Sequence, residues 1–162
     1  YGPLYVGDAG DSAYVKQIID EHEIDSVIHF AASAYVGESM TNPGKYFRNN
    51  VTAMQSLLDR CIESGVKHFI FSSSCATYGI PNETPIREDM PQKPINPYGE
   101  TKLIGEQMLN WYSQCHDFKY VALRYFNACG DDPDGEIGEV HDPETHLIPI
   151  VLQAALGKRE YI

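Results

Sequence analysis

The chain has 162 residues and a formal net charge of −11, and 43% of its residues are hydrophobic and 22% charged. This length and composition are typical of one soluble globular domain with a core of useful size. The negative charge argues against nucleic acid or an anionic membrane surface as a partner. No apolar run approaches the roughly 18 residues of a membrane span, so we expect a cytoplasmic protein.

Apolar stretches and amphipathic stretches alternate along the chain. In chain order they predict a strand at 4–6, a helix at 12–23, a strand at 26–32, a helix at 43–64, a strand at 68–74, a loop at 79–97, a helix at 98–115, a strand at 120–126 and a helix at 147–156. Strands separated by helices indicate parallel βαβ units. The fold class is therefore α/β, with a doubly wound, Rossmann-like parallel sheet. The acidic segment at 127–146 is expected to be a solvated loop.

Cysteines and histidines give no sign of a metal centre. The four cysteines show no C-x-x-C pairing, and no histidine lies at ligand spacing from them. Such cysteines are typical of a reduced cytosolic protein. The six histidines are scattered singly, so each is better explained as a surface residue or a hydrogen-bonded core residue. We predict no metal ion.

Two short motifs hold the residues with chemical potential. "SSSCATYG" at 72–79 closes a strand with Ser74, and "NPYGETK" at 96–102 opens a helix with Tyr98 and Lys102. A Y-x-x-x-K match alone arises easily by chance, and serine is an ordinary turn residue. In parallel α/β sheets, however, ligands bind at the carboxyl ends of the strands, and helix residues four apart share a face. A hydroxyl, a phenol and an ammonium group would then converge there.

Such a group suits proton removal from an alcohol whose carbon gives up a hydride. A tyrosine phenol with a pKa near 10 is a poor base at neutral pH. A nearby Lys102 ammonium would favour the phenolate and lower the pKa of Tyr98. Ser74 could hydrogen-bond the same substrate hydroxyl and hold it in line.

Seven motifs in order and in register carry a resemblance to a known family. They are "GDAGD", "VIHFAASAYVGES", "NNV", "FIFSSSCATYG", "PINPYGETK", "LRYFNACG" and "ETHLIP". With them the chain resembles the extended short-chain dehydrogenase/reductase family, and within it the UDP-glucose 4-epimerase group. The resemblance covers essentially all 162 residues.

The resemblance implies a role for each matching position. Tyr98 would be the acid/base, Lys102 would bind the nicotinamide ribose and lower the pKa of the tyrosine, and Ser74 would assist proton transfer. The implied NAD-binding residues are Asp8, Ala9, Phe30, Ala31, Ala32, Asn50, Ser72, Tyr98, Lys102 and Tyr125. The implied UDP-sugar-binding residues are Ser74, Tyr98, Phe126, Asn127, His146 and Leu147.

The resemblance also implies how the chain is organised. Residues 1–126 would form a Rossmann-like NAD-binding domain, and 127–162 would begin an interleaved substrate domain. The Gly-rich turn that seats the pyrophosphate normally lies roughly 60 residues upstream. We therefore expect an internal fragment, cut at both ends and inactive by itself, of an enzyme that forms a homodimer through the helices at 43–64 and 98–115.

The implied reaction inverts C4 of a UDP-hexose, UDP-galactose or UDP-glucose, through a 4-keto intermediate with bound NAD. A nucleotide-sugar 4,6-dehydratase is disfavoured because its relatives carry Asp and Glu where this chain has Cys75 and Ala76. A 4-epimerase for UDP-N-acetylglucosamine or UDP-xylose stays open. So does a dinucleotide-binding protein that kept the fold and lost the chemistry.

Overall fold

The computed structural model describes residues 2–130, 132–138, 141–142 and 144–162. The chain forms two compact units, Tyr1–Arg124 and Tyr125–Ile162, and each is described by itself. The predicted division at 126/127 lies close to this boundary. The functions predicted for the two parts remain predictions.

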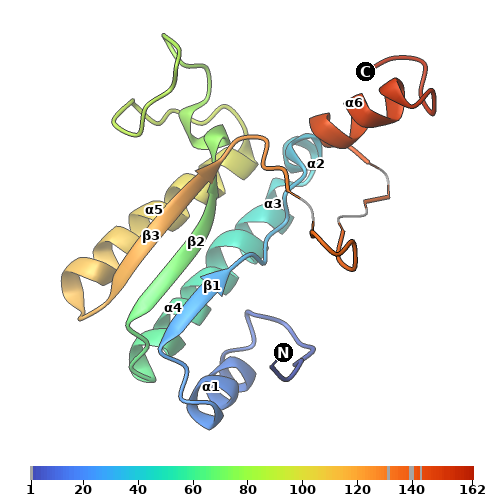
Figure 1. The fold of residues 1–162 in the computed structure, drawn as a ribbon. Coiled ribbons are helices and arrows are strands. Elements are labelled where there is room, and N and C mark those ends of the chain that lie inside the picture. The colour runs from blue at the N-terminus through green and yellow to red at the C-terminus, as the bar shows by residue number, and fades with distance from the viewer. Residues whose placement is uncertain (1, 131, 139–140, 143) are drawn as a thin grey trace. The chain divides into compact units, whose positions relative to one another are not determined.

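The first unit is built on a three-stranded sheet in the order β1-β2-β3 (Figure 1). Its strands are β1 (Ser26–His29), β2 (His68–Ser74) and β3 (Lys119–Tyr125). β1 and β2 pair in parallel, from Ser26 opposite His68 to His29 opposite Phe71. Helices connect successive strands, as parallel pairing requires. The predicted α/β fold with a Rossmann-like parallel sheet is confirmed.

Two long helices, α4 (Ala53–Glu63) and α5 (Pro97–Cys115), lie on one face of this sheet (Figure 1). α5 begins where the Asn96 side chain accepts a hydrogen bond from the Gly99 amide at 2.8 Å, with proline in the first turn. The core lies between the helices and the sheet. Its most completely buried apolar side chains include Met54, Leu58, Cys61, Phe69, Leu109 and Phe118. Full burial of a side chain such as Leu58 contributes about 1.5–3 kcal/mol.

The opposite face of the sheet is apolar and exposed in this chain. Side chains alternate along a strand, so Tyr120 and Ala122 pack against the core while Val121 and Leu123 point away from it. Val121 is 54% exposed, and Ile28 on β1 is 57% exposed. An antiparallel sheet could leave one face in water, but parallel sheets usually have both faces covered.

Two predicted strands differ in the structure. The strand expected at 4–6 is wrong: this segment belongs to no helix or strand, and Leu4 and Val6 are 88% and 84% exposed. An isolated extended segment has no neighbour to satisfy its backbone groups, and β1 pairs only with β2 among the described residues. The strand predicted at 26–32 ends at His29.

The predicted helix at 43–64 is divided into three pieces. They are α3 (Pro43–Tyr46), a π-helix η1 (Phe47–Thr52) and α4. A short helix, α2 (Val36–Thr41), precedes them and was not predicted. The π-helix was invisible in the sequence because the apolar spacing through this region also fits a continuous α-helix.

The remaining helices are shorter. α1 (Ser12–Glu21) is capped by Asp11, whose side chain accepts hydrogen bonds from two backbone amides. A 3₁₀ turn, η2 (Cys75–Tyr78), follows β2 directly. In the second unit, the described residues of 127–146 form no helix or strand, as predicted for the acidic loop, and the remaining residues of that loop lie outside the described part of the chain. α6 (Leu147–Ala155) takes the place of the predicted helix. Among the described residues, no helix combines the length and apolar character that a membrane crossing requires.

Candidate active site

The end of β2 and the first turns of α5 bring the three predicted catalytic residues together. The Lys102 ammonium donates a hydrogen bond to the backbone carbonyl of Ser72 at 2.7 Å. Its Nζ lies 5.7 Å from the centre of the Tyr98 ring and 5.0 Å from that of Phe71. The Ser74 side chain lies near enough to the Tyr98 phenol to lower its pKa. The convergence of hydroxyl, phenol and ammonium groups at one strand end is therefore present in the structure.

Burial controls the protonation of this group. Burial raises the pKa of Tyr98 above its ordinary value of 10, and the neighbouring Ser74 side chain acts in the opposite direction. Burial also lowers the pKa of Lys102 to about 8. The expected lowering of the tyrosine pKa by Lys102 is not found in this chain. The ammonium is directed to the Ser72 carbonyl rather than to the phenol, so burial of the phenol dominates.

A second tyrosine supports the first. Tyr46 is completely buried, and its ring meets that of Tyr98 edge-on, with centroids 6.5 Å apart. Its hydroxyl lies 2.6 Å from the Tyr35 carbonyl and 2.9 Å from a Glu38 oxygen. Burial, which is the larger cause, and the Glu38 carboxylate together raise the pKa of Tyr46 to about 12. This phenol therefore stays protonated. Sequence reasoning missed Tyr46 because no motif links it to Tyr98.

Asn50 is buried in the π-helix and joins two other segments. Its Oδ1 accepts from the Ser33 amide at 2.8 Å, and its Nδ2 donates to the Ser33 carbonyl at 2.9 Å. The same Nδ2 lies 3.1 Å from Thr101 Oγ1 on α5. Both ends of this amide therefore have protein partners, and Asn50 fixes the backbone after β1. Its predicted contact with the cofactor stays a prediction.

Three of the predicted NAD-binding residues line one cavity of about 450 Å³. They are Asp8, Ala9 and Ala31, and the cavity is completed by Gly7, His29, Asn49 and Ala53. Phe30 is 70% exposed, and Ala32 is half-buried. Ser72 has a buried hydroxyl with no hydrogen-bond partner among the described residues. A buried unpaired hydroxyl costs free energy, so this atom is suited to receive a polar group of a ligand.

His29 lies on the floor of the same region. The residue is only 8% exposed, and its ring stacks on Phe71 with 6.1 Å between centroids. Burial is the main cause that lowers the pKa of His29 to about 4, and the charge of Lys102 acts in the same direction. This side chain is therefore neutral at pH 7 and adds no charge beside Lys102.

The second unit holds the remaining predicted residues. Tyr125, Phe126, Asn127, His146 and Leu147 line a cavity of about 220 Å³. His146 is also the N-cap of α6, and the start of a helix of this length favours an anionic group. The predicted substrate-binding positions in this set are thus brought together within their own unit, beside Tyr125, which was predicted to bind NAD.

Glu144 organises the start of α6 and was missed by sequence reasoning. Its Oε1 accepts from the Thr145 and His146 amides at 2.8 Å each and lies 2.9 Å from His146 Nδ1. The backbone hydrogen bond with His146 is the main cause that lowers the pKa of Glu144. His141 Nδ1 lies 3.7 Å from the same carboxylate. The sequence suggested that every histidine is isolated, but His141 and His146 both lie close to the Glu144 carboxylate.

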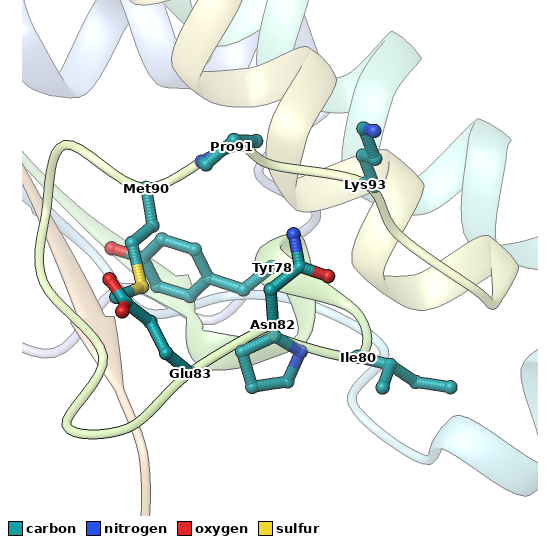
Figure 2. Close-up of a pocket in the computed structure, with 8 residues that line it drawn as sticks. Tyr78, Ile80, Asn82, Glu83, Met90, Pro91 and Lys93 are labelled. Atoms are coloured by element: carbon teal, nitrogen blue, oxygen red, sulfur yellow. The ribbon is translucent and has the colours of Figure 1, made fainter.

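A separate pocket of about 320 Å³ lies outside this constellation (Figure 2). Its lining comes from the end of η2 and from the loop at 79–97, including Tyr78, Asn82, Glu83 and Met90. None of the three candidate catalytic residues lines it. The Tyr78 hydroxyl is bonded to Arg124 Nη1 at 2.6 Å.

A parallel α/β sheet with a serine at one strand end, and with a tyrosine and a lysine on the helix beside it, is typical of the Rossmann-like class of proteins. The profile of the NAD dependent epimerase/dehydratase family matches residues 3–162. The chain belongs to this family, and the resemblance predicted from the motifs is confirmed at this level.

Individual relatives agree with the family. UDP-glucose 4-epimerase of Streptococcus mutans is 53% identical over 160 residues, which cover 98% of this chain and 48% of the relative. The crystal structure of UDP-glucose 4-epimerase from Brucella ovis in complex with NAD superposes with a TM-score of 0.94 at 54% identity, over 100% of this chain and 50% of that chain. For the UDP-Glc/GlcNAc 4-epimerase of Campylobacter jejuni the TM-score is 0.78 at 40% identity, over 96% and 47%. The chain therefore spans about half the length of these relatives.

The described residues fit NAD, the cofactor of this family. The unpaired Ser72 hydroxyl and the Lys102 ammonium offer polar contacts at the strand end. The lining of the cavity with Asp8 includes one glycine and three alanines, which permit close approach of a ligand to the backbone. NAD bound at this edge would supply the acceptor and donor for a hydride.

Proposed function

We propose that the protein containing this chain is an NAD-dependent epimerase that inverts C4 of a UDP-hexose, interconverting UDP-galactose and UDP-glucose. The observation that carries the proposal is the convergence of Ser74, Tyr98 and Lys102 at the end of β2. It occurs in a chain 53% identical to a relative named UDP-glucose 4-epimerase.

The proposed chemistry assigns one task to each group. The Tyr98 oxygen takes the proton of the C4 hydroxyl, and the hydride from C4 would be accepted by the NAD⁺ that this site would hold. Tyr98 returns the proton after the 4-keto sugar has turned over in the site. Ser74, whose side chain acts on the pKa of Tyr98, holds the same hydroxyl in line. Lys102 binds the ribose of the cofactor and provides positive charge near the phenol. Inversion results because the hydride returns to the other face of C4.

The protonation of Tyr98 sets a requirement on the assembled protein. With its pKa above 10 in this chain, little phenolate exists at neutral pH. Each unit by which the pKa falls contributes about 1.4 kcal/mol in favour of the phenolate. The proposal therefore requires that binding of cofactor and substrate bring positive charge closer to this oxygen than Lys102 stands here.

The substrate is proposed to occupy the second unit's cavity at Phe126, Asn127, His146 and Leu147. Two of the similar structures support a nucleotide ligand in this family. One, from Bifidobacterium longum, is named as a complex with NAD⁺ and UDP, and one from Thermotoga maritima as a complex with UDP-glucose. A homodimer through α4 and α5 stays a prediction.

A second candidate is a broader 4-epimerase that also accepts UDP-N-acetylglucosamine. The similarity to the Campylobacter jejuni UDP-Glc/GlcNAc 4-epimerase favours it. A 4,6-dehydratase has less support, because Cys75 and Ala76 follow Ser74 where an acid and a base would be needed.

The test uses the full-length protein and a coupled assay for UDP-galactose, with UDP-N-acetylgalactosamine in parallel. Tyr98→Phe should lose at least about 10²-fold in kcat while it keeps its fold and bound NAD. Tyr112→Phe is the matched control, because Tyr112 lies on the same helix but is bonded to Asp59 on α4. Wild-type protein without epimerisation, or Tyr98→Phe with normal turnover, would refute the proposal.

A further inference from the structure

Helix α5 and the end of β2 are joined at three successive helical turns. Tyr98, Lys102 and Glu106 are spaced four residues apart and so lie on one face of α5. Tyr98 meets the Ser74 side chain, and Lys102 meets the Ser72 carbonyl. Glu106 Oε1 accepts a hydrogen bond from Ser73 Oγ at 2.5 Å. Two of these joints belong to the candidate catalytic group, and the third has no role in the proposed chemistry.

We propose that Glu106, held by Arg124, is a positioning residue for the reaction, which fixes the strand end 72–74 against Tyr98 and Lys102 through Ser73. The inference rests on the proposed function. It concerns a residue that touches neither substrate nor cofactor and acts through the strand end.

Both oxygens of the Glu106 carboxylate accept hydrogen bonds from neighbouring side chains. Arg124 contacts both oxygens, with Nε 3.0 Å from Oε1 and Nη2 2.7 Å from Oε2. Gln92 Nε2 donates to Oε2 at 3.0 Å. Burial raises the pKa of Glu106, but the hydrogen bonds from Arg124, Ser73 and Gln92 outweigh it and leave the pKa below its ordinary value. A fully bonded carboxylate with a bidentate partner has a fixed geometry.

Arg124 extends the same network to the neighbouring segments. It is the last residue of the first unit and lies on β3. Its Nη1 is 2.6 Å from the Tyr78 hydroxyl and 2.9 Å from the Glu88 carbonyl. Its guanidinium lies 5.0 Å from the centre of the Tyr78 ring, which lines the pocket in Figure 2. The position of Glu106 is thus set from β3 and from the segment after β2.

Ser73 is well placed to transmit this geometry. Side chains alternate along a strand, so Ser73 points to the helix-covered side with Phe71 and Phe69, which belong to the core. Ser72 and Ser74 have the other orientation. Anchoring Ser73 therefore fixes the backbone that carries the Ser72 carbonyl and the Ser74 hydroxyl without occupying either.

The role is more than general stability. A buried ion pair is weak evidence for net stability, since apolar side chains of similar volume often replace it without loss. A displacement of about 1 Å at reacting groups can cost on the order of 10²-fold in rate. The benefit of this network is therefore expected in kcat, at the strand end to which it is bonded.

The test uses the NAD-loaded, full-length protein and two variants. Glu106→Gln removes the charge at nearly constant shape, and Ser73→Ala removes only the joint to the strand while it leaves the ion pair with Arg124. Both should lower kcat for UDP-galactose about 10-fold to 100-fold with KM changed less than about 3-fold. Because the two act through one contact, the double variant should lose little more than either single variant.

Asp59→Asn is the matched control, because it weakens a different side-chain anchor of α5, at Tyr112. It should lower the melting temperature and leave kcat unchanged. If Glu106→Gln or Ser73→Ala lowers the melting temperature but the folded enzyme keeps wild-type kcat, the role is only structural and the proposal fails. If Glu106→Gln does not fold, Ser73→Ala alone decides between the two roles.

A second readout does not depend on turnover. The ¹³Cζ resonance of labelled Tyr98, identified by its absence in Tyr98→Phe, reports the surroundings of the phenol, which include the Ser74 side chain. It should shift in Glu106→Gln and in Ser73→Ala but not in Asp59→Asn. If wild-type protein shows no epimerisation, the proposed function fails, and the resonance still decides whether Glu106 positions the strand end; an unshifted resonance in both variants overturns the inference.

Discussion

Gly99, which follows Tyr98, is the position where one added methyl group should do most damage to the proposed chemistry. A Cβ at Gly99 would lie 2.5 Å from the backbone oxygen of Ala76 and 3.1 Å from its carbon. These are backbone atoms of the turn η2, which cannot rotate away as a side chain can. Gly99→Ala must therefore separate the start of α5 from η2.

The displacement can be sized from these contacts. Cβ atoms essentially never approach within 3.0 Å of a non-bonded heavy atom, so the two segments must separate by at least about 0.5 Å. Such overpacking costs about 1–3 kcal/mol, and alanine in place of a helical glycine returns about 1 kcal/mol. The net loss of stability should be only about 0–2 kcal/mol. Tyr98 moves with the helix and Ser74 with the turn, so kcat should fall about 10-fold to 100-fold.

The assay compares kcat for UDP-galactose and the free energy of unfolding in urea for the full-length protein. Gly37→Ala is the matched control, since Gly37 is also helical but a Cβ there meets no atom within 4 Å. It should gain up to about 1 kcal/mol and keep its activity. Wild-type kcat in Gly99→Ala would show that the distance between η2 and α5 does not govern the reaction, and would refute the reasoning.

Two predictions concern the pH dependence of stability. Burial lowers the pKa of Lys102 to about 8, so between pH 8 and 10.5 the unfolded chain binds more protons than the folded one. As the pH rises through this window, the free energy of unfolding of wild-type protein should therefore increase by roughly 2–4 kcal/mol relative to that of Lys102→Met. If urea unfolding gives both proteins the same change in this free energy with pH, the burial of the Lys102 ammonium is contradicted. Burial and Lys102 lower the pKa of His29 to about 4, so wild-type stability should fall as the pH decreases from 6.5 to 4. His29→Leu should flatten that acid slope, and an unchanged slope would assign it to other groups.

The parts of the site that depend on local sequence were predictable. The buried strand at 68–74 has the predicted bounds in the structure. The start of α5 follows from Asn96 as N-cap and Pro97 in the first turn, and four-residue spacing places Tyr98 and Lys102 on one face. These features need only nearest neighbours along the chain, so pattern and capping chemistry suffice.

The parts that depend on contacts between distant segments were not predictable. Tyr46 against Tyr98 and Glu106 with Arg124 each join residues that no motif connects. The pKa of Tyr98 went in the opposite direction from the expectation, because spacing gives proximity to Lys102 but not the direction of its hydrogen bond. The strand predicted at 4–6 failed for a similar reason, since a strand depends on a partner that local pattern does not specify.

The π-helix η1 makes the length of this region as important as its composition. It lies between Tyr46, which packs on Tyr98, and Met54 and Leu58, which fill the core. A π-helix amounts to one residue inserted into an α-helix, and one residue corresponds to a rotation of about 100° around the helix axis. Deleting a single residue at 47–52 would let the segment relax into an uninterrupted α-helix, but Tyr46 and the core residues could then no longer face their partners together. Alignments of related chains should accordingly contain substitutions here and almost no gaps.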